Sequence, residues 1–308
     1  KKMFPADFIL EATEQVRLWF SLLSICSTIT LDQQPFKAVY THGMMLDYQG
    51  LKMSKSLGNI ISPYEVVDKH GADVLRFYMG GVPAGENINF SWEDVKAKQR
   101  TLGVLWNLHM LVLSLAEEIG VNPSKIKKET LGLEEEYALT VTNNTISTVT
   151  EAFEKYELDK VPQALEEFVF KLSRTYVQLI REKTDEDEKL AVLKTLYNSV
   201  LTALQLSAPV VPFLTEGIYQ NLRDAFNLEE ESVHLLEWPT ANEKKMNASL
   251  EKNMATVQDV VRAVLACRER IKRSTRWPLQ TITVVSSSKE VAEAVTSLNS
   301  VLLTQCNV

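Results

Sequence analysis

The sequence predicts a mostly α-helical protein that begins as the end of an α/β domain, continues as a helix bundle and closes as a small α/β region. In residues 1–90, short β-rich segments alternate with helical ones, which is typical of the last part of a parallel α/β sheet. From residue 92 to about 220, apolar residues recur at helical spacing. We therefore predict domains at 1–90, 91–240 and 241–308.

In the α/β part, β-rich and helical segments follow one another with clear boundaries. The predicted elements are strands at Phe8–Leu10 and Lys37–Thr41 and helices at 14–30, 63–70 and 72–79. The helix at 63–70 has the clearest start, because Ser62, Pro63 and Glu65 form the pattern of an N-cap, a first-position proline and a capping-box acid.

The remaining segments are predominantly helical. Bundle helices are predicted at 92–119, 139–156, 158–183, 190–206 and 213–225, with the acidic tract 184–188 as an exposed loop. After the bundle we expect an extended segment at 232–238, a helix at 250–272, a strand at 281–285 and a helix at 289–298.

The composition excludes several classes of protein. Of 308 residues, 45% are apolar and 24% charged, which excludes a mainly disordered chain. No apolar run approaches the roughly 18 uncharged residues of a membrane span. Cys26, Cys267 and Cys306 are too few and too scattered for a disulfide framework or a zinc knuckle, which favours the cytoplasm. Because the net charge is −7, nucleic-acid binding would depend on local basic patches.

The polar loop at 50–58 carries the most specific chemical signal in the chain. Its core reads Lys-Met-Ser-Lys-Ser at 52–56, lies between two glycines and follows a predicted strand. Two ammonium groups can neutralise charge on a leaving pyrophosphate, and serine hydroxyls can donate to its oxygens. The glycines allow the loop to close over a substrate at the sheet edge where α/β domains bind ligands. The alternative is a solvated lysine–serine turn, which the complete pentapeptide disfavours.

This pentapeptide resembles the second signature motif of the class I aminoacyl-tRNA synthetases. The resemblance extends over nearly the whole chain, through Leu-Gly-Asn (57–59), Gly-Ala-Asp-Val-Leu-Arg (71–76), Leu-Trp-Asn (105–107), Ser-Ala-Pro (207–209), Pro-Phe (212–213), Ser-Val-His-Leu (232–235), Trp-Pro (238–239) and Arg-Trp-Pro-Leu (276–279). Together these stretches resemble the C-terminal half of an isoleucyl-tRNA synthetase. The resemblance implies the end of a Rossmann-like catalytic domain with the lysine loop, an anticodon-binding helix bundle and the start of a C-terminal tRNA-contact region.

The resemblance also implies roles for individual residues. Lys52 and Lys55 would be catalytic residues that bind the ATP phosphates. The segment from Glu11 to Phe20 resembles the family's Glu-Gly-x-Asp-Gln-x-Arg-Gly-Trp-Phe sequence. The residues implied to bind ATP or the adenylate are Glu11, Gln15, His42, Gly43, Ser54 and Ser56, and Trp19 is implied to lie near the amino-acid pocket.

The chain departs from this family pattern near the implied adenylate pocket. Ala12 and Leu18 replace glycines, and Glu14 replaces an aspartate. A β-carbon at position 12 would obstruct close approach of the backbone to a nucleotide, and an extra methylene at position 14 would displace the carboxylate. Two interpretations stay open: a divergent working enzyme, or a synthetase-like protein with weakened activation.

Two further features of the family are absent from these 308 residues. The chain contains neither a His-Ile-Gly-His-type motif nor the large editing insertion of the group. Residue 1 is lysine, and the ends at 1 and 308 have the appearance of boundaries within a longer protein. The resemblance therefore implies that this chain alone does not activate isoleucine.

Basic residues are concentrated near the C-terminal end of the helix predicted at 250–272. The segment from Arg262 to Arg276 contains six basic residues and one acidic residue, Glu269, and it is followed directly by Trp277. Arginines beside an aromatic ring suit RNA phosphates and an unstacked base, although a solvated helix end would also collect cations. The predicted tRNA-binding residues are Arg268, Arg270, Lys272, Arg273 and Arg276, with Arg174 and Arg181 in the bundle, where a salt-bridged surface is the equal alternative.

The resulting hypothesis is that the chain forms part of an isoleucine-specific ligase, which we expect to be cytoplasmic and monomeric. Its substrates would be isoleucine, tRNA and ATP with Mg²⁺, and no protein-bound metal is expected. The alternatives are a non-catalytic synthetase-like protein that binds tRNA, and a valine- or leucine-specific synthetase.

Overall fold

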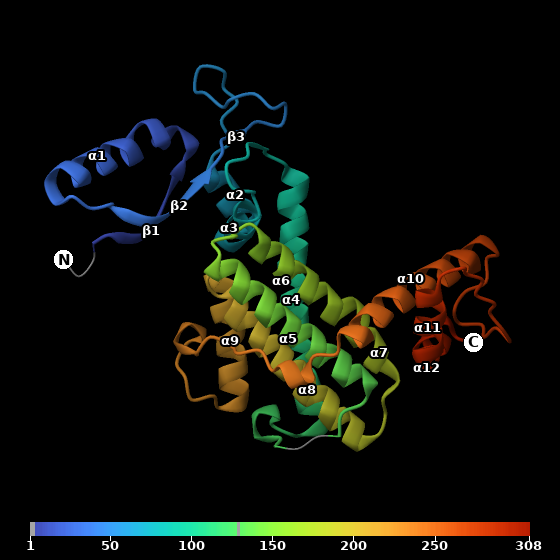
Figure 1. Ribbon diagram of the computed structural model, residues 1–308. Coiled ribbons are helices and arrows are strands. Elements are labelled where there is room, and N and C mark those ends of the chain that lie inside the picture. The colour runs from blue at the N-terminus through green and yellow to red at the C-terminus, as the bar shows by residue number, and fades with distance from the viewer. Residues whose placement is uncertain (1–3, 128–129) are drawn as a thin grey trace. The chain divides into compact units, whose positions relative to one another are not determined.

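The computed structural model describes residues 4–127 and 130–308, and these residues fold into two compact units (Figure 1). The first unit comprises residues up to Gly103 with Val149–Leu165 and Ser207–Leu214. The second comprises Val104–Thr148, Glu166–Leu206 and Thr215–Val308. The chain is mostly helical with a small α/β part, so the fold class predicted from the sequence is confirmed, apart from the strand expected near the C-terminus.

The N-terminal sheet has two parallel strands, β1 (Ala6–Ala12) and β2 (Phe36–His42), which pair from Ala6 opposite Phe36 to Ala12 opposite His42. Both strands were predicted. The helix predicted at 14–30 divides into a 3-10 turn at Thr13–Arg17 and α1 (Trp19–Leu31). The division has a local cause, because the Gln15 side chain accepts a hydrogen bond from the Trp19 backbone N–H (3.3 Å) at the start of α1.

A second pair of short parallel strands follows β2, formed by β3 (Met45–Leu46) and β4 (Ile88–Asn89). Between them lie α2 (Pro63–His70) and α3 (Ala72–Gly80), at the predicted positions. The predicted capping box of α2 is wrong: the Ser62 side chain makes no cap hydrogen bond, and Glu65 pairs with Lys69 at 2.7 Å instead.

Two polar side chains of α3 hold the turn that precedes α9 (Pro212–Phe226). The Asp73 carboxylate accepts a hydrogen bond from the Leu214 backbone N–H (2.6 Å) in the first turn of α9. The Arg76 guanidinium donates to the carbonyls of Pro209 (3.1 Å) and Val210 (2.8 Å). A carboxylate at a helix N-terminus and an arginine on free carbonyls both satisfy backbone groups that a turn leaves unpaired.

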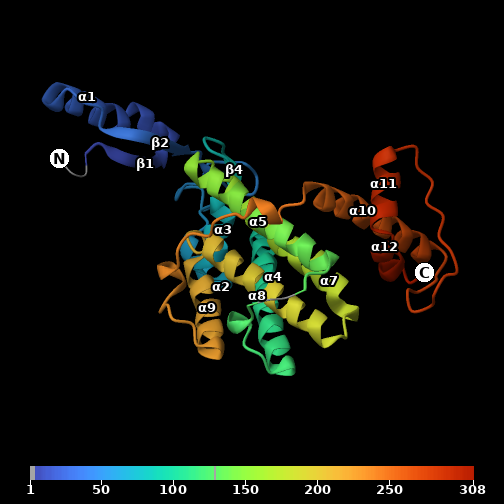
Figure 2. The same ribbon diagram turned by 60° about the horizontal axis from the view of Figure 1, so that its bottom comes forward.

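The helices from residue 92 onward largely follow the predicted pattern. They are α4 (Trp92–Ile119), α5 (Leu133–Glu154), α6 (Lys160–Phe170), α7 (Val177–Leu179), α8 (Glu186–Ser207), α9, α10 (Ala248–Arg270), α11 (Lys289–Ser297) and α12 (Asn299–Cys306). Figures 1 and 2 show α5 beside α8, where the Thr142 and Ser199 hydroxyls hydrogen-bond at 2.9 Å.

Several predicted elements differ from the structure. The helix predicted at 158–183 is interrupted by a π-helix at Lys171–Tyr176 and ends in a 3-10 turn at Ile180–Glu182. The acidic tract is partly helical, because the Asp185 carboxylate accepts the Asp187 backbone N–H (2.9 Å) and caps α8. The extended segment at 232–238 contains a 3-10 turn instead, and α12 was not predicted.

The strand predicted at 281–285 is wrong. These residues lie in the described part of the chain and adopt no regular structure there. Alternating β-branched residues require a neighbouring strand to pair with, and Val285 is exposed at 91% instead.

Among the described helices, α4 alone is long and apolar enough to cross a membrane by length and composition. Core helices of globular proteins meet the same criterion. Leu105, Leu108 and Val112 of α4 are buried in the protein, as the helical spacing of the sequence predicts for a bundle helix.

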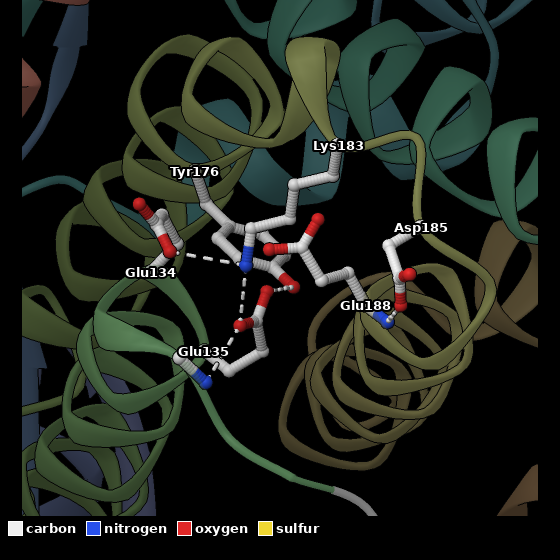
Figure 3. A network of polar contacts seen from close by, with 7 residues as sticks. Glu134, Glu135, Tyr176, Lys183, Asp185 and Glu188 are labelled. Carbon is white, nitrogen blue, oxygen red and sulfur yellow. Dashed lines mark hydrogen bonds and ion pairs between the residues drawn. The ribbon is translucent and has the colours of Figure 1, made fainter.

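A polar network joins the start of α5 to the segment before α8 (Figure 3). The Lys183 ammonium lies between two carboxylates, 2.7 Å from Glu135 and 3.0 Å from Glu134. The Tyr176 hydroxyl donates to the other oxygen of Glu135 at 3.2 Å. Glu135 is fully buried, and it also accepts the Gly132 backbone N–H at 3.0 Å. Every partner is satisfied within the network, as a buried charge requires.

Candidate functional site

The lysine loop at 52–58 begins directly after a tight turn that follows β3. The Asp47 carboxylate is buried and accepts hydrogen bonds from the backbone N–H groups of Gln49 (2.9 Å) and Leu51 (2.8 Å). Gly50 closes this turn with φ +80°, a conformation that favours glycine. Lys52 then forms an antiparallel bridge with Leu46. The turn therefore fixes where the loop begins.

The Asn59 side chain connects the end of the loop to its beginning. Its amide nitrogen donates to the other oxygen of Asp47 (2.8 Å) and to the Lys52 carbonyl (3.3 Å). Its amide oxygen accepts the Ser54 backbone N–H at 2.9 Å. The Asn59 amide is thus bonded to the Asp47 carboxylate and to the loop backbone. The pKa of Asp47 is lowered by the hydrogen bonds that its carboxylate accepts, first by the one from Asn59.

The side chains of the loop remain available to a ligand. Lys52 and Lys55 are exposed, and neither forms an ion pair with any residue in 4–127 or 130–308. The Ser54 and Ser56 hydroxyls lie 3.1 Å apart, and that of Ser54 also accepts the Leu57 backbone N–H at 3.3 Å. Two free ammonium groups and two hydroxyls on one short loop form a set of donors suited to phosphate oxygens.

The carboxyl ends of β1 and β2 bring the other predicted nucleotide residues together. Glu11 pairs with Thr41, and Ala12 with His42, so the predicted residues lie on adjacent strands at one edge of the sheet. The Glu11 carboxylate accepts the Ala12 backbone N–H at 3.1 Å, and His42 Nδ1 lies 2.8 Å from the Gly43 carbonyl. This is the edge at which parallel sheets bind ligands.

Position 43 requires glycine because a neighbouring chain segment leaves no space for a side chain there. A β-carbon at this position would lie 2.0 Å from the carbonyl oxygen of Glu86. The backbone at 85–88 crosses so close to the end of β2 that any side chain would force it away, and Gly85 donates to the Thr41 carbonyl at 2.8 Å. Glycine at position 43 therefore keeps two chain segments together at the sheet edge.

The three departures from the family pattern occupy different environments. Ala12 is buried at the end of β1, whereas Leu18 is 54% exposed and Glu14 is also exposed. Trp19 is 43% exposed and its ring lies 5.4 Å from that of Phe20. The assignment of Trp19 to the amino-acid pocket stays a prediction.

The basic residues in the last turn of α10 and directly after it divide into an exposed group and one buried arginine. Arg270, Lys272, Arg273 and Arg276 are exposed. The Arg273 guanidinium lies over the Trp277 ring, 5.6 Å from its centre. This exposed group combines positive charge with an accessible aromatic face, which suits a nucleic-acid backbone and an unstacked base.

Arg268 does not belong to this exposed group, which corrects the prediction that it contacts tRNA. It is 2% exposed, and its guanidinium donates to the carbonyls of Cys306 (2.8 Å), Trp277 (3.0 Å) and Asn307 (3.2 Å). These carbonyls lie at the end of α12 and in the loop after α10, and that of Asn307 also accepts the Leu279 backbone N–H at 3.0 Å. The helical spacing of the sequence places arginine at a buried position, which charge counting alone does not reveal.

In the bundle, the predicted tRNA residues Arg174 and Arg181 are both exposed. Arg174 lies over the Phe170 ring at 3.8 Å. The neighbouring Lys171 is taken up by ion pairs with Glu167 (2.7 Å) and Glu251 (2.8 Å). The described part of the chain holds no cluster of histidine, cysteine or acidic side chains that could bind a metal ion.

Sequence reasoning missed Asp47 and Asn59. Asn59 lies in a quoted motif, but nothing in its spacing indicates that it bonds to the loop backbone. Asp47 precedes Gly50 in a turn-forming stretch. This pattern predicts the turn but does not indicate which side chain bonds to Asp47.

Comparisons with known proteins agree with this geometry. Residues 1–91 match the family model described as tRNA synthetases class I (I, L, M and V), and residues 135–283 match the anticodon-binding domain of tRNA ligase. Isoleucine--tRNA ligases of Pyrococcus furiosus and Thermococcus kodakarensis are 40% and 38% identical over the whole of this chain. An isoleucine--tRNA ligase of Methanosarcina barkeri is 38% identical over 99% of it. The chain spans about 30% of the length of each of these relatives.

Two solved structures share the fold. A LeuRS–tRNA–LeuAMS ternary complex from Agrobacterium radiobacter has a TM-score of 0.65, with 22% identity over 80% of this chain and 30% of that one. Mycobacterium tuberculosis methionyl-tRNA synthetase with methionyl-adenylate has a TM-score of 0.58, with 20% identity over 76% of this chain and 51% of that one. With the lysine loop beside a parallel sheet and a helix bundle after it, the chain belongs to the class I aminoacyl-tRNA synthetases, and its curated relatives are isoleucine--tRNA ligases.

Proposed function

We propose that this chain supplies the phosphate-binding loop and the tRNA-binding helices of an isoleucine--tRNA ligase. The complete enzyme would activate isoleucine with ATP and transfer it to tRNA(Ile) during translation in the cytoplasm, as a monomer. The observation that carries this proposal is the similarity of the whole chain to isoleucine--tRNA ligases, combined with a loop whose two lysines form no ion pair with the described residues.

Within this proposal, Lys52 and Lys55 bind the phosphates of ATP, which enters as its magnesium complex. Their ammonium groups stabilise negative charge as the carboxylate of isoleucine attacks the α-phosphorus and pyrophosphate leaves. The Ser54 and Ser56 hydroxyls donate to phosphate oxygens, and Glu11, Gln15, His42 and Gly43 bind the adenylate. Trp19 borders the amino-acid pocket.

The RNA surface in this proposal consists of Arg270, Lys272, Arg273 and Arg276 around Trp277, with Arg174 and Arg181 on the bundle. Its support is exposure and local charge, because phosphate contacts require accessible cations. A non-catalytic tRNA-binding protein remains the second candidate, favoured by the altered positions Ala12, Glu14 and Leu18.

The test measures tRNA binding and pyrophosphate exchange separately. The 308-residue chain is titrated with tRNA(Ile), tRNA(Val) and tRNA(Leu) over a series of salt concentrations, and we expect tRNA(Ile) to bind most tightly and affinity to fall with salt. Equal binding of all three would contradict isoleucine specificity. The full-length protein that contains this chain is assayed for ATP–pyrophosphate exchange with isoleucine, valine and leucine in turn. Inactivity with all three amino acids would favour the non-catalytic tRNA-binding protein.

A further inference from the structure

The lysine loop is fixed at both ends through two side chains that do not themselves face a ligand. Asp47 lies before the loop and Asn59 after it, and they are joined by a 2.8 Å hydrogen bond. Their other hydrogen bonds are to backbone groups within residues 49–54. They therefore act on the path of the chain and leave the lysine side chains free.

The amide of Asn59 determines the backbone on both sides of Met53. It accepts from the N–H of Ser54 (2.9 Å) and donates to the carbonyl of Lys52 (3.3 Å). Because an amide has separate donor and acceptor ends, only one orientation of Asn59 satisfies all three partners. Asp47 selects that orientation, since an ionised carboxylate accepts from the amide nitrogen and cannot donate to the amide oxygen.

We infer that Asp47 and Asn59 form a clamp that holds the 52–58 loop ready for polyphosphate, so that both are positioning residues for Lys52 and Lys55. The inference rests on the proposed function of the loop. Holding the backbone in advance means that binding a phosphate does not have to order the loop as well, and less of the binding free energy is lost.

Trypsin provides a direct measure, because it cleaves after Lys52 and Lys55 themselves. The 308-residue chain and its Asp47→Ala and Asn59→Ala variants are digested briefly with and without tripolyphosphate, and the cuts are assigned by mass spectrometry. Cleavage after the exposed Lys155, in the turn directly after α5, serves as an internal reference. Gln49→Ala is the matched control, since it keeps the backbone N–H that Asp47 accepts and removes only an exposed side chain.

In the absence of tripolyphosphate we expect both clamp variants to be cut in the loop about tenfold faster than wild type, as the loss of a charge-assisted hydrogen bond predicts. Tripolyphosphate should slow loop cleavage in wild type and Gln49→Ala, and this protection should be lost in both clamp variants. The double variant Asp47→Asn with Asn59→Asp restores one carboxylate–amide pair and should regain part of the protection.

The possible contradictions are distinguishable. Loop cleavage of the clamp variants at the wild-type rate would overturn the clamp. Faster cleavage with full protection by tripolyphosphate would also overturn the inference, because the loop would then bind phosphate without being positioned. Absence of protection in wild type would instead contradict the proposed phosphate-binding function, and the positioning role would fall with it.

Discussion

Two exposed lysines of the loop after β3 and one lysine of the helix bundle carry the same charge in opposite environments. Lys52 and Lys55 are exposed on the loop after β3 and have no ion-pair partner in the described chain. Lys183 has 12% of its side chain exposed and lies between Glu134 and Glu135, with Tyr176 completing the network (Figure 3). The first group is available to a ligand, whereas the second is used by the fold.

The difference shows what local charge in a sequence does and does not indicate. A lysine in a short loop and a lysine near a helix end carry the same charge in the sequence. Only the position of acidic side chains from another helix decides which of them is neutralised, and Glu135 is 48 residues away from Lys183 in the chain.

The arginines repeat this contrast. Arg268 is buried on backbone carbonyls, and Arg273, five positions later, is exposed over Trp277. The same segment therefore contains one arginine that supports the structure and others that are exposed to solvent.

The strongest test of the contrast is Lys183→Met. This change leaves the fully buried Glu135 carboxylate without its cation, and we expect the free energy of unfolding to fall by about 3–5 kcal/mol. Urea denaturation followed by circular dichroism measures it. Lys55→Met is the matched control and should leave the midpoint unchanged; an equal loss in both variants would remove the distinction between the two groups.

The next largest effect is expected for Arg268→Met, which keeps the length of the side chain and removes its donors. The carbonyls of Trp277 and Cys306 would lose the guanidinium, while that of Asn307 would keep only the Leu279 backbone N–H. Hydrogen bonds to a charged group contribute about 1.5–3 kcal/mol. We expect faster hydrogen exchange at the end of α12 and lower thermal stability. Unchanged exchange there would mean that Arg268 does not hold these segments together.

The order of the elements could be predicted from the sequence because it depends on local patterns. Strands β1 and β2 and helices α2, α3, α4 and α9 follow from alternation, helical spacing and proline or glycine boundaries. The position of the lysine loop follows from the Lys-Met-Ser-Lys-Ser sequence at 52–56 itself.

Other features depend on partners distant in sequence and could not be predicted in this way. The strand expected at 281–285 has no neighbour to pair with, and the 3-10 turn at 13–17 depends on how Gln15 caps α1. The clamp of Asp47 and Asn59 joins residues that no periodicity relates.

A smaller effect is expected for Arg273→Ala, which tests the exposed side of the contrast. Removing one phosphate contact should lower the slope of log affinity for tRNA against log salt by about 1, without a change in stability. Glu269→Ala, also exposed beside it, is the control and should leave this slope unchanged. Filter binding over a salt series measures both, and an unaltered slope for Arg273→Ala would exclude it from the RNA surface.

The smallest expected effect is on the pH dependence of stability, through the buried histidine of α4. His109 is fully buried in α4, and burial lowers its pKa below the usual value of about 6.5. Because the unfolded chain then binds the proton more readily than the folded one, stability is lost as pH falls below about 6.5 and is unaffected above it. His109→Gln keeps a polar side chain near Asn221, which lies 3.2 Å from His109 Nε2, and removes the titration. Denaturation midpoints are measured between pH 7.5 and pH 5.5, about one unit either side of the usual histidine pKa. They should fall less in the variant than in wild type, whereas parallel curves would show that His109 does not link folding to protons.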